Sequence, residues 1–190
     1  MTPKIFQAAE WATVMHDGQR RKYDGTPYIT HVFRVAARVA VLPETAFHGN
    51  KEDAVVAALL HDVVEDCCKD GLTADDLRNT IARKFGTPVA ILVDALTDQP
   101  KEWGNRKARK EDTKTRLVNA SRDARTIKCA DLLDNAADIV CNDKNFGPRF
   151  LEEKAELLPY LDGAYRPILD ECYAELSRLK QYVRKVKTSA

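Results

Sequence analysis

The segment HDVVED, residues 61–66, carries four side chains that could do chemistry: His61, Asp62, Glu65 and Asp66. If the segment is helical, His61 and Glu65 share one face, and Asp62 and Asp66 share a second face about 100° away. An adjacent imidazole and carboxylate can bind one metal ion, and the two carboxylates one turn later can hold a water molecule next to it. The spacing therefore predicts a metal site that activates water.

Charged residues four positions apart are also common at a helix end that faces water. The apolar run AVVAALL at residues 54–60 favours the metal site, because a helix that is apolar on all sides is buried and buried charges need partners. One helical turn cannot complete a metal shell, so further ligands must come from other helices. Among the other histidines, His31 opens an apolar helix, whereas His16 and His48 stand in polar or loop-like surroundings.

A second polar stripe lies in KCADLLDNAADIV, residues 128–140. Polar residues recur there at steps of three and four among apolar ones: Lys128, Asp131, Asn135 and Asp138. Such a stripe on a helix can line a cavity. The alternative is an amphipathic helix that faces water, and for Asp134 and Asp138 taken singly that alternative is at least as strong.

Helices must position these groups, since apolar residues recur at helical spacing through most of the chain and no convincing strand pairs are evident. Asn50 and Thr73 are typical of residues that cap the start of a helix. The single strand signal is a short hairpin near residues 97–105. We therefore expect an all-α bundle, built as one domain over residues 1–190, with at most that hairpin.

Composition and charge exclude several classes of protein. Thirty basic residues against 29 acidic ones leave a net charge of +1, so no overall field attracts nucleic acid or an anionic membrane. The densest basic run, at residues 105–116, is interleaved with Glu111 and Asp112 and predicts a solvated helix or a mobile rim, not an RNA-binding surface.

The location in the cell is predicted from what the chain lacks. The N-terminal segment has no signal-peptide core and no stretch is long enough to span a bilayer, so we expect a cytoplasmic protein with no membrane partner. Five cysteines without CxxC spacing fit neither a disulfide framework nor a zinc ribbon. The sequence leaves the oligomeric state open, and a homo-oligomer is one of the options.

Three motifs occur in order: GQRRKYDGTPYITH at residues 18–31, LLHDVVED at 59–66 and KCADLLDN at 128–135. Together they resemble the successive motifs of HD-domain phosphohydrolases of the RelA/SpoT type, specifically the stand-alone small alarmone hydrolases. The resemblance runs from about residue 10 to about residue 160. It implies an all-α HD-domain bundle with a deep metal-containing cleft, which hydrolyses the 3′-pyrophosphate of guanosine tetraphosphate or pentaphosphate, (p)ppGpp, to GDP or GTP and pyrophosphate.

The resemblance also implies roles for single residues. It implies one Mn²⁺ ion per chain, and the matching ligands are His31, His61, Asp62 and Asp131. It implies that Glu65 and Asp66 position and deprotonate the attacking water. Arg21 and Lys22 match a pair that contacts the guanine and the phosphates, and Asn135 matches an asparagine one turn after the last metal ligand. The nearest counter-charges for a leaving pyrophosphate are Arg20, Arg21, Lys22 and Lys128.

Two positions depart from the family pattern. Family members usually carry a basic residue after the last metal-binding aspartate and a histidine or tyrosine before the asparagine, where this chain has Leu132 and Asp134. These positions are expected to flank the pocket, so a 2′-phosphatase acting on NADPH, or another nucleotide phosphohydrolase that uses the same site, is a second hypothesis. A third is a nucleotide-sensing module without turnover, which intact Glu65 and Asp66 disfavour. The ligand types suit Mn²⁺ but would also bind Zn²⁺, Fe²⁺ or Co²⁺.

Overall fold

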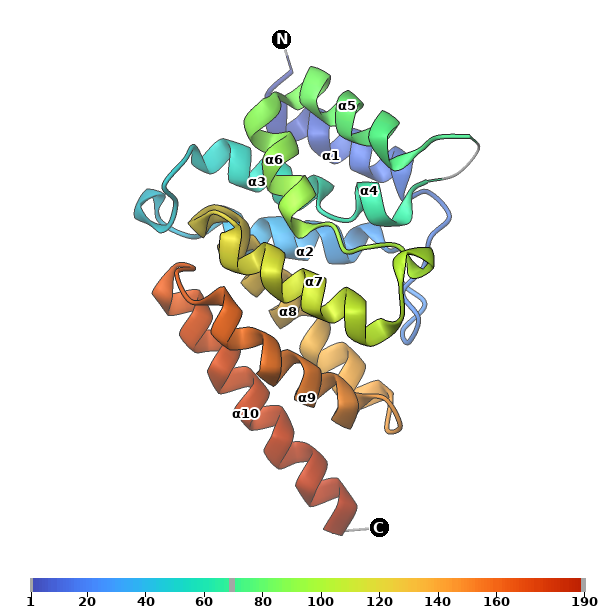
Figure 1. Ribbon diagram of the computed structural model, residues 1–190, viewed down its shortest axis with the longest axis vertical. Coiled ribbons are helices and arrows are strands. Elements are labelled where there is room, and N and C mark those ends of the chain that lie inside the picture. Colours follow the sequence, from blue (N-terminus) through green and yellow to red (C-terminus); the bar gives the residue numbers. More distant parts are fainter. Residues whose placement is uncertain (1, 69–70, 189–190) are drawn as a thin grey trace.

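The structure is a computed structural model that describes residues 2–68 and 71–188, and it shows helices joined by loops (Figure 1). The α-helices are α1 (Lys4–Met15), α2 (Ile29–Ala40), α3 (Lys51–Leu60), α4 (Val63–Asp66), α5 (Ala74–Phe85), α6 (Thr87–Leu96), α7 (Arg106–Asn119), α8 (Arg122–Asn142), α9 (Gly147–Leu157) and α10 (Arg166–Thr188). Short 3₁₀ helices add η1 (Glu44–Ala46), η2 (Lys101–Trp103) and η3 (Leu158–Leu161). In the two described stretches no strand forms, and an isolated bridge joins Arg20 to Pro27. The expected all-α fold is confirmed.

The hairpin predicted near residues 97–105 is wrong. The chain there forms a loop that contains η2, and Pro100 and Gly104 flank this short helix. The Asn105 side chain then caps α7 by accepting a hydrogen bond from the backbone N–H of Ala108. A helix starts where a second strand would be needed, because this cap and the absence of alternating apolar residues both favour it.

Helix α3 is packed on all sides by α1, α2 and α6. Each residue from Ala54 to Leu60 is at most 5% exposed. The predicted cap is present, since Asn50 accepts hydrogen bonds from the backbone N–H groups two and three residues later. Burial of each valine or leucine contributes roughly 1.5–3 kcal/mol. The buried apolar run therefore places the start of the polar HDVVED segment inside the core.

The spacing of the HDVVED segment predicts one continuous helix, but the structure shows a break within it. Helix α3 ends at Leu60, His61 and Asp62 form a turn, and α4 follows as a single helical turn. His61 Nδ1 donates to the carbonyl oxygen of Ala58, which in a continuous helix would accept the N–H of Asp62. This competition accounts for the break. Right-handed helical dihedrals at both turn residues keep Glu65 about one turn beyond His61.

Helix α8 connects the two halves of the bundle. It packs against α2, α3 and α6 on one side and against α9 and α10 on the other (Figure 1). Ser121 caps its N-terminus, and its apolar residues are largely buried. A capping box at Thr73 likewise starts α5, as predicted. In the part of the chain that the structure describes, no helix is both long and apolar enough to cross a bilayer.

Candidate metal centre and hydrolytic cleft

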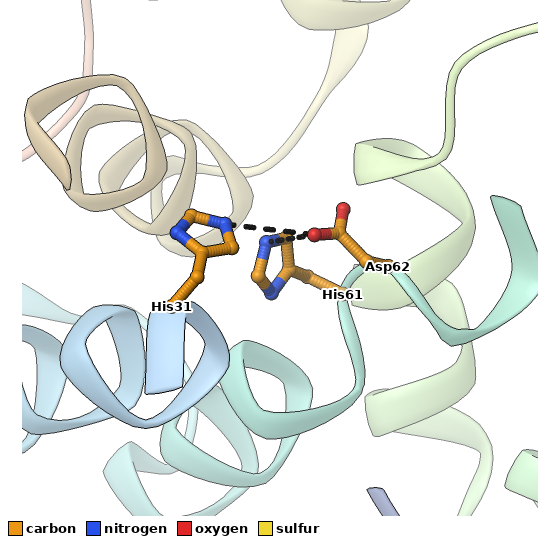
Figure 2. A group of neighbouring side chains, drawn as sticks. All are labelled: His31, His61 and Asp62. Atoms are coloured by element: carbon orange, nitrogen blue, oxygen red, sulfur yellow. Dashed lines mark ion pairs between the residues drawn. The ribbon is translucent and has the colours of Figure 1, made fainter. Parts of the chain in front are cut away.

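Two buried imidazoles from different helices lie face to edge near the end of α3 (Figure 2). His31 stands in the first turn of α2, and His61 directly follows α3. Their ring centroids are 5.3 Å apart, and both side chains are almost fully buried. Among the described residues, neither Nε2 atom has a hydrogen-bond partner. A buried polar atom without a partner is costly, so two of them beside each other indicate a ligand site.

Carboxylates from two elements approach these nitrogens. Asp62 Oδ2 lies 3.0 Å from His61 Nε2 and 3.6 Å from His31 Nε2, the two contacts dashed in Figure 2. The shorter contact is not aligned as a hydrogen bond. From α8, Asp131 Oδ1 lies 3.5 Å from His31 Nε2 and 3.9 Å from His61 Nε2. The structure therefore brings together all four residues that the sequence offered as metal ligands.

The spacing of these atoms fits a divalent cation. Ligand atoms of His31, His61 and Asp62 all lie within 4.8 Å of one another, and Asp131 approaches the same nitrogens. Ligands that bind one ion at about 2.1 Å lie about 3–4 Å from each other. A mixed nitrogen and oxygen set of this kind suits Mn²⁺, Zn²⁺, Fe²⁺ or Co²⁺. The residues present therefore fit a bound metal ion.

The outer nitrogen of each imidazole faces an acceptor that has no proton to give. His61 Nδ1 lies 2.8 Å from the carbonyl oxygen of Ala58, and His31 Nδ1 lies 2.6 Å from Asp134 Oδ2. Each Nδ1 atom must therefore carry the proton, which leaves Nε2 as the nitrogen that can bind a metal. Burial lowers the pKa of His31, but the nearby carboxylates of Asp131, Asp134 and Asp62 outweigh it and raise that pKa to about 11.

The inner carboxylates are held by neighbours that keep them ionised. Tyr28 Oη donates to Asp62 Oδ2 at 2.6 Å. Asn135 Nδ2 donates to Asp131 Oδ1 at 2.7 Å, and Lys128 Nζ lies 2.9 Å from Asp131 Oδ2. Burial alone would raise the pKa of Asp131, but Lys128 and the two imidazoles hold it well below its usual range. Lys128 and Asn135, expected to contact substrate, here contact the inner carboxylate.

Glu65 and Asp66 lie on α4 with their side chains exposed to solvent. Glu65 Oε2 accepts a hydrogen bond from the backbone N–H of Asp98 at 3.1 Å. Partial desolvation raises the pKa of Glu65 to about 7, and the carboxylates of Asp98 and Asp62 add to the rise. Desolvation and Asp62 raise the pKa of Asp66 to about 6. A carboxylate with a pKa near neutrality can accept and return a proton at physiological pH.

The arginine and the lysine of the RK pair lie in different surroundings. Arg21 is 7% exposed, and its Nη2 and Nε atoms donate to Asp138 Oδ2 at 2.5 and 3.1 Å. Its Nη1 atom donates to Asn135 Oδ1 at 3.3 Å. Lys22 is exposed and pairs with Asp143 at 3.1 Å. Both line a cavity of about 290 Å³ that also includes Asn135, so Lys22 is the freer of the two to meet a ligand.

Four residues near the site were not singled out from the sequence. Tyr28 contacts Asp62, and Arg34 contacts Asp134 at 2.6 Å. Asp98 contacts Glu65, and Lys154 of α9 lies close enough to Lys128 and Asp131 for their charges to act on it. Burial lowers the pKa of Lys154, and the charge of Lys128 adds to that effect. Tyr28 alone had a sequence signal, because it belongs to the PYITH element; the others stand in segments that resemble ordinary charged surface.

Comparisons with known proteins find similarity over most of the chain. A family model described as HD domain matches residues 8–153. The chain is 33% identical over 143 residues to the guanosine-3′,5′-bis(diphosphate) 3′-pyrophosphohydrolase MESH1 of Drosophila melanogaster, covering 73% of this chain and 71% of that protein. It is 38% identical over 134 residues to a GTP pyrophosphokinase of Streptomyces coelicolor, covering 70% of this chain but 14% of that longer protein.

A solved structure is similar along nearly its whole length. It is described as that of a metazoan ortholog of SpoT that hydrolyses ppGpp and plays a role in starvation responses. Superposition with this chain gives a TM-score of 0.78 at 27% sequence identity, covering 94% of this chain and 96% of that one. The similarity therefore continues past residue 153, where the family model ends, into α10.

Proposed function

The chain belongs to the HD-domain family, and we propose that it is a metal-dependent hydrolase that removes the 3′-pyrophosphate of (p)ppGpp, giving GDP or GTP and pyrophosphate. One observation carries the proposal: two unpartnered Nε2 atoms and two ionised carboxylates converge one helical turn before Glu65, a carboxylate whose pKa is near neutrality. The activities for which the MESH1 relative and the SpoT ortholog are named support the same reaction.

We propose Mn²⁺ as the metal, with His31, His61, Asp62 and Asp131 as its ligands. A divalent ion there supplies Lewis acidity, which lowers the pKa of water and offsets charge on the phosphates. Tyr28 and Lys128 hold the two carboxylates in place, so the site is ordered before substrate arrives. Such preorganisation is general in metal hydrolases, because positioned groups around the ligands fix their orientation.

Glu65 is the proposed general base, and Asp66 helps to orient the water. Glu65 takes a proton from the water while the water oxygen attacks the phosphorus that is bonded to the ribose 3′-oxygen. The bond between that phosphorus and the 3′-oxygen breaks, and the proton that Glu65 gained passes to the departing 3′-oxygen. A positioned base of this kind contributes about 10²- to 10⁴-fold to the rate. Lys22 is positioned to attract the anionic nucleotide into the cavity that it lines.

Steady-state assays with Mn²⁺ on a panel of ppGpp, pppGpp, NADPH and GDP test the substrate. The proposal requires the highest kcat/KM for ppGpp or pppGpp, with no comparable turnover of NADPH. Comparable kcat/KM values for NADPH and ppGpp would instead favour the 2′-phosphatase. Absence of turnover on every compound, in a protein that holds its metal, would favour the nucleotide-sensing module.

Replacing Lys22 by Gln is expected to raise KM for ppGpp and leave kcat nearly unchanged. The lysine is largely exposed at the cavity, so its charge should act on bound substrate and transition state alike. Exposed ion pairs are weak, and we expect a rise in KM of about two- to fivefold. Lys144→Gln is the matched control, because Lys144 is exposed and lines a different cavity. Equal effects of both variants would place the nucleotide elsewhere.

Metal binding is expected to release protons and to weaken as the pH falls. In the metal-free protein, burial lowers the pKa of both site histidines, but the surrounding carboxylates outweigh it, so the pKa of His31 reaches about 11 and that of His61 is raised. His31 is thus protonated at neutral pH, and a metal ion must displace the proton from its Nε2 atom. Calorimetry in buffers of different ionisation enthalpy should report release of about one proton or more per Mn²⁺. Binding without proton release would contradict the ligand set.

A further inference from the structure

Asp134 contacts His31 rather than the cavity that Arg21 and Lys22 line. The sequence placed it among the positions that flank the pocket, yet the residues that line the 290 Å³ cavity do not include it. Its Oδ2 atom lies 2.6 Å from His31 Nδ1, and its side chain is 11% exposed. His31 is itself fully buried, so this hydrogen bond is shielded from competing water.

Arg34 holds the same carboxylate from the outside. Its Nε atom donates to Asp134 Oδ1 at 2.6 Å, and its Nη2 atom donates to Asp134 Oδ2 at 3.2 Å. A fork of two guanidinium donors on two carboxylate oxygens requires that both oxygens be free of protons. Arg21 Nη1, 3.6 Å from Asp134 Oδ2, adds positive charge on the same side. Asp134 can therefore only accept from His31.

The contact with Asp134 sets the tautomer of the His31 imidazole. Because Asp134 Oδ2 only accepts, the proton of a neutral His31 must sit on Nδ1, and the lone pair must sit on Nε2. Nε2 is the atom that lies beside Asp62 and Asp131, at 3.6 and 3.5 Å. The hydrogen bond also fixes the ring orientation, since rotating the ring would break a 2.6 Å contact. His61 has the same arrangement with a backbone carbonyl, so both rings present Nε2 inward.

We propose that Asp134 is a positioning residue that holds His31 Nε2 toward the metal, and that Arg34 holds Asp134 in the orientation that this requires. The inference rests on the proposed metal-dependent function and adds a role at a position where this chain departs from its family. Partners of metal-binding histidines typically affect metal affinity by 10- to 100-fold when removed. Asp134 thus acts on the metal through His31, and its effect on substrate is indirect.

Titration with Co²⁺ tests this role, because its visible absorption reports the ligand field as well as the affinity. Asp134→Asn keeps size but can present an amide N–H to Nδ1, which permits the wrong tautomer. We expect its Co²⁺ dissociation constant to rise about 10- to 100-fold with a changed absorption band. Arg34→Gln should give a smaller rise. Arg38→Gln is the matched control, since Arg38 lies one turn further on α2 in an exposed pair with Glu171, and it should bind Co²⁺ like the parent.

A second measurement uses the unaltered protein and does not depend on the folding of a variant. In the Zn²⁺-loaded parent, ¹⁵N NMR of labelled imidazoles should show the His31 proton on Nδ1 and the metal on Nε2. Parental Co²⁺ affinity and spectrum in folded Asp134→Asn, or a His31 proton on Nε2, would overturn the role of Asp134 and leave the proposed function standing. A parent protein that binds neither Co²⁺ nor Zn²⁺ would overturn both.

Discussion

Glu65→Gln is expected to lower kcat for ppGpp by about 10²- to 10⁴-fold, because the variant loses the group that accepts the proton from water. The lower limit corresponds to about 2.7 kcal/mol in the activation barrier. The amide oxygen of Gln can still accept the hydrogen bond from Asp98 N–H, so the loop and α4 should keep their positions. Metal content and nucleotide affinity should therefore stay close to those of the parent. Turnover, elemental analysis and calorimetry on one preparation measure the three quantities.

Glu102→Gln is the matched control for this variant. Glu102 lines the same cavity of about 450 Å³ as Glu65 and Asp98 but stands on η2, and no described contact joins it to the metal site. Its loss should leave kcat within about twofold of the parent, as expected for an exposed surface substitution. A Glu65→Gln protein that turned over ppGpp at the parental rate would remove Glu65 from the mechanism.

His61→Ala is expected to abolish bound metal and activity together. His61 is buried and supplies one of the two unpartnered Nε2 atoms, so its loss removes one of the two proposed nitrogen ligands. A ligand that binds only the folded state stabilises it by about 2.7 kcal/mol at 100 times its dissociation constant. The rise in melting temperature that Mn²⁺ gives the parent should therefore vanish in His61→Ala. Thermal melts with and without Mn²⁺ measure it.

The informative quantity is the change in melting temperature that Mn²⁺ causes, and not the melting temperature of each variant by itself. Asp131→Ala should lose the metal too, but it also leaves buried Lys128 without its carboxylate, which destabilises the protein with or without metal. His48→Ala provides the control, because His48 is exposed and its ring contacts Arg122 and none of the proposed ligands. Stoichiometric Mn²⁺ in purified His61→Ala would show that the ligand set is wrong.

The helices and the ligand cluster could be predicted because local chemistry decides them. Asn50 and Thr73 start helices through hydrogen bonds to residues two or three positions away, which a sequence displays directly. The apolar run before His61 predicts burial, and a buried charged segment predicts partners from other helices. The motifs then supplied His31 and Asp131, which lie 30 positions before and 70 positions after His61.

Other features depended on contacts between distant segments. The break after Leu60 follows from a side-chain hydrogen bond that takes a backbone acceptor, and spacing alone cannot reveal that. The hairpin was wrong because Asn105 caps a helix in place of a second strand. Arg21 lies against Asp138, 117 positions away, so its burial could not be read from the loop in which it stands. Asp134 was ambiguous for the same reason, since its partners come from α2.

Phosphorus NMR of ppGpp incubated with the Mn²⁺-loaded protein tests the central claim most directly. The proposed reaction requires GDP and pyrophosphate to appear in equal amounts, with no free orthophosphate and no singly shortened nucleotide on the way. The same sample of Glu65→Gln, with its metal in place, should leave ppGpp intact over the time in which the parent consumes it. Release of orthophosphate, or unchanged ppGpp with the metal-loaded parent, would contradict the assignment of this site to 3′-pyrophosphate hydrolysis.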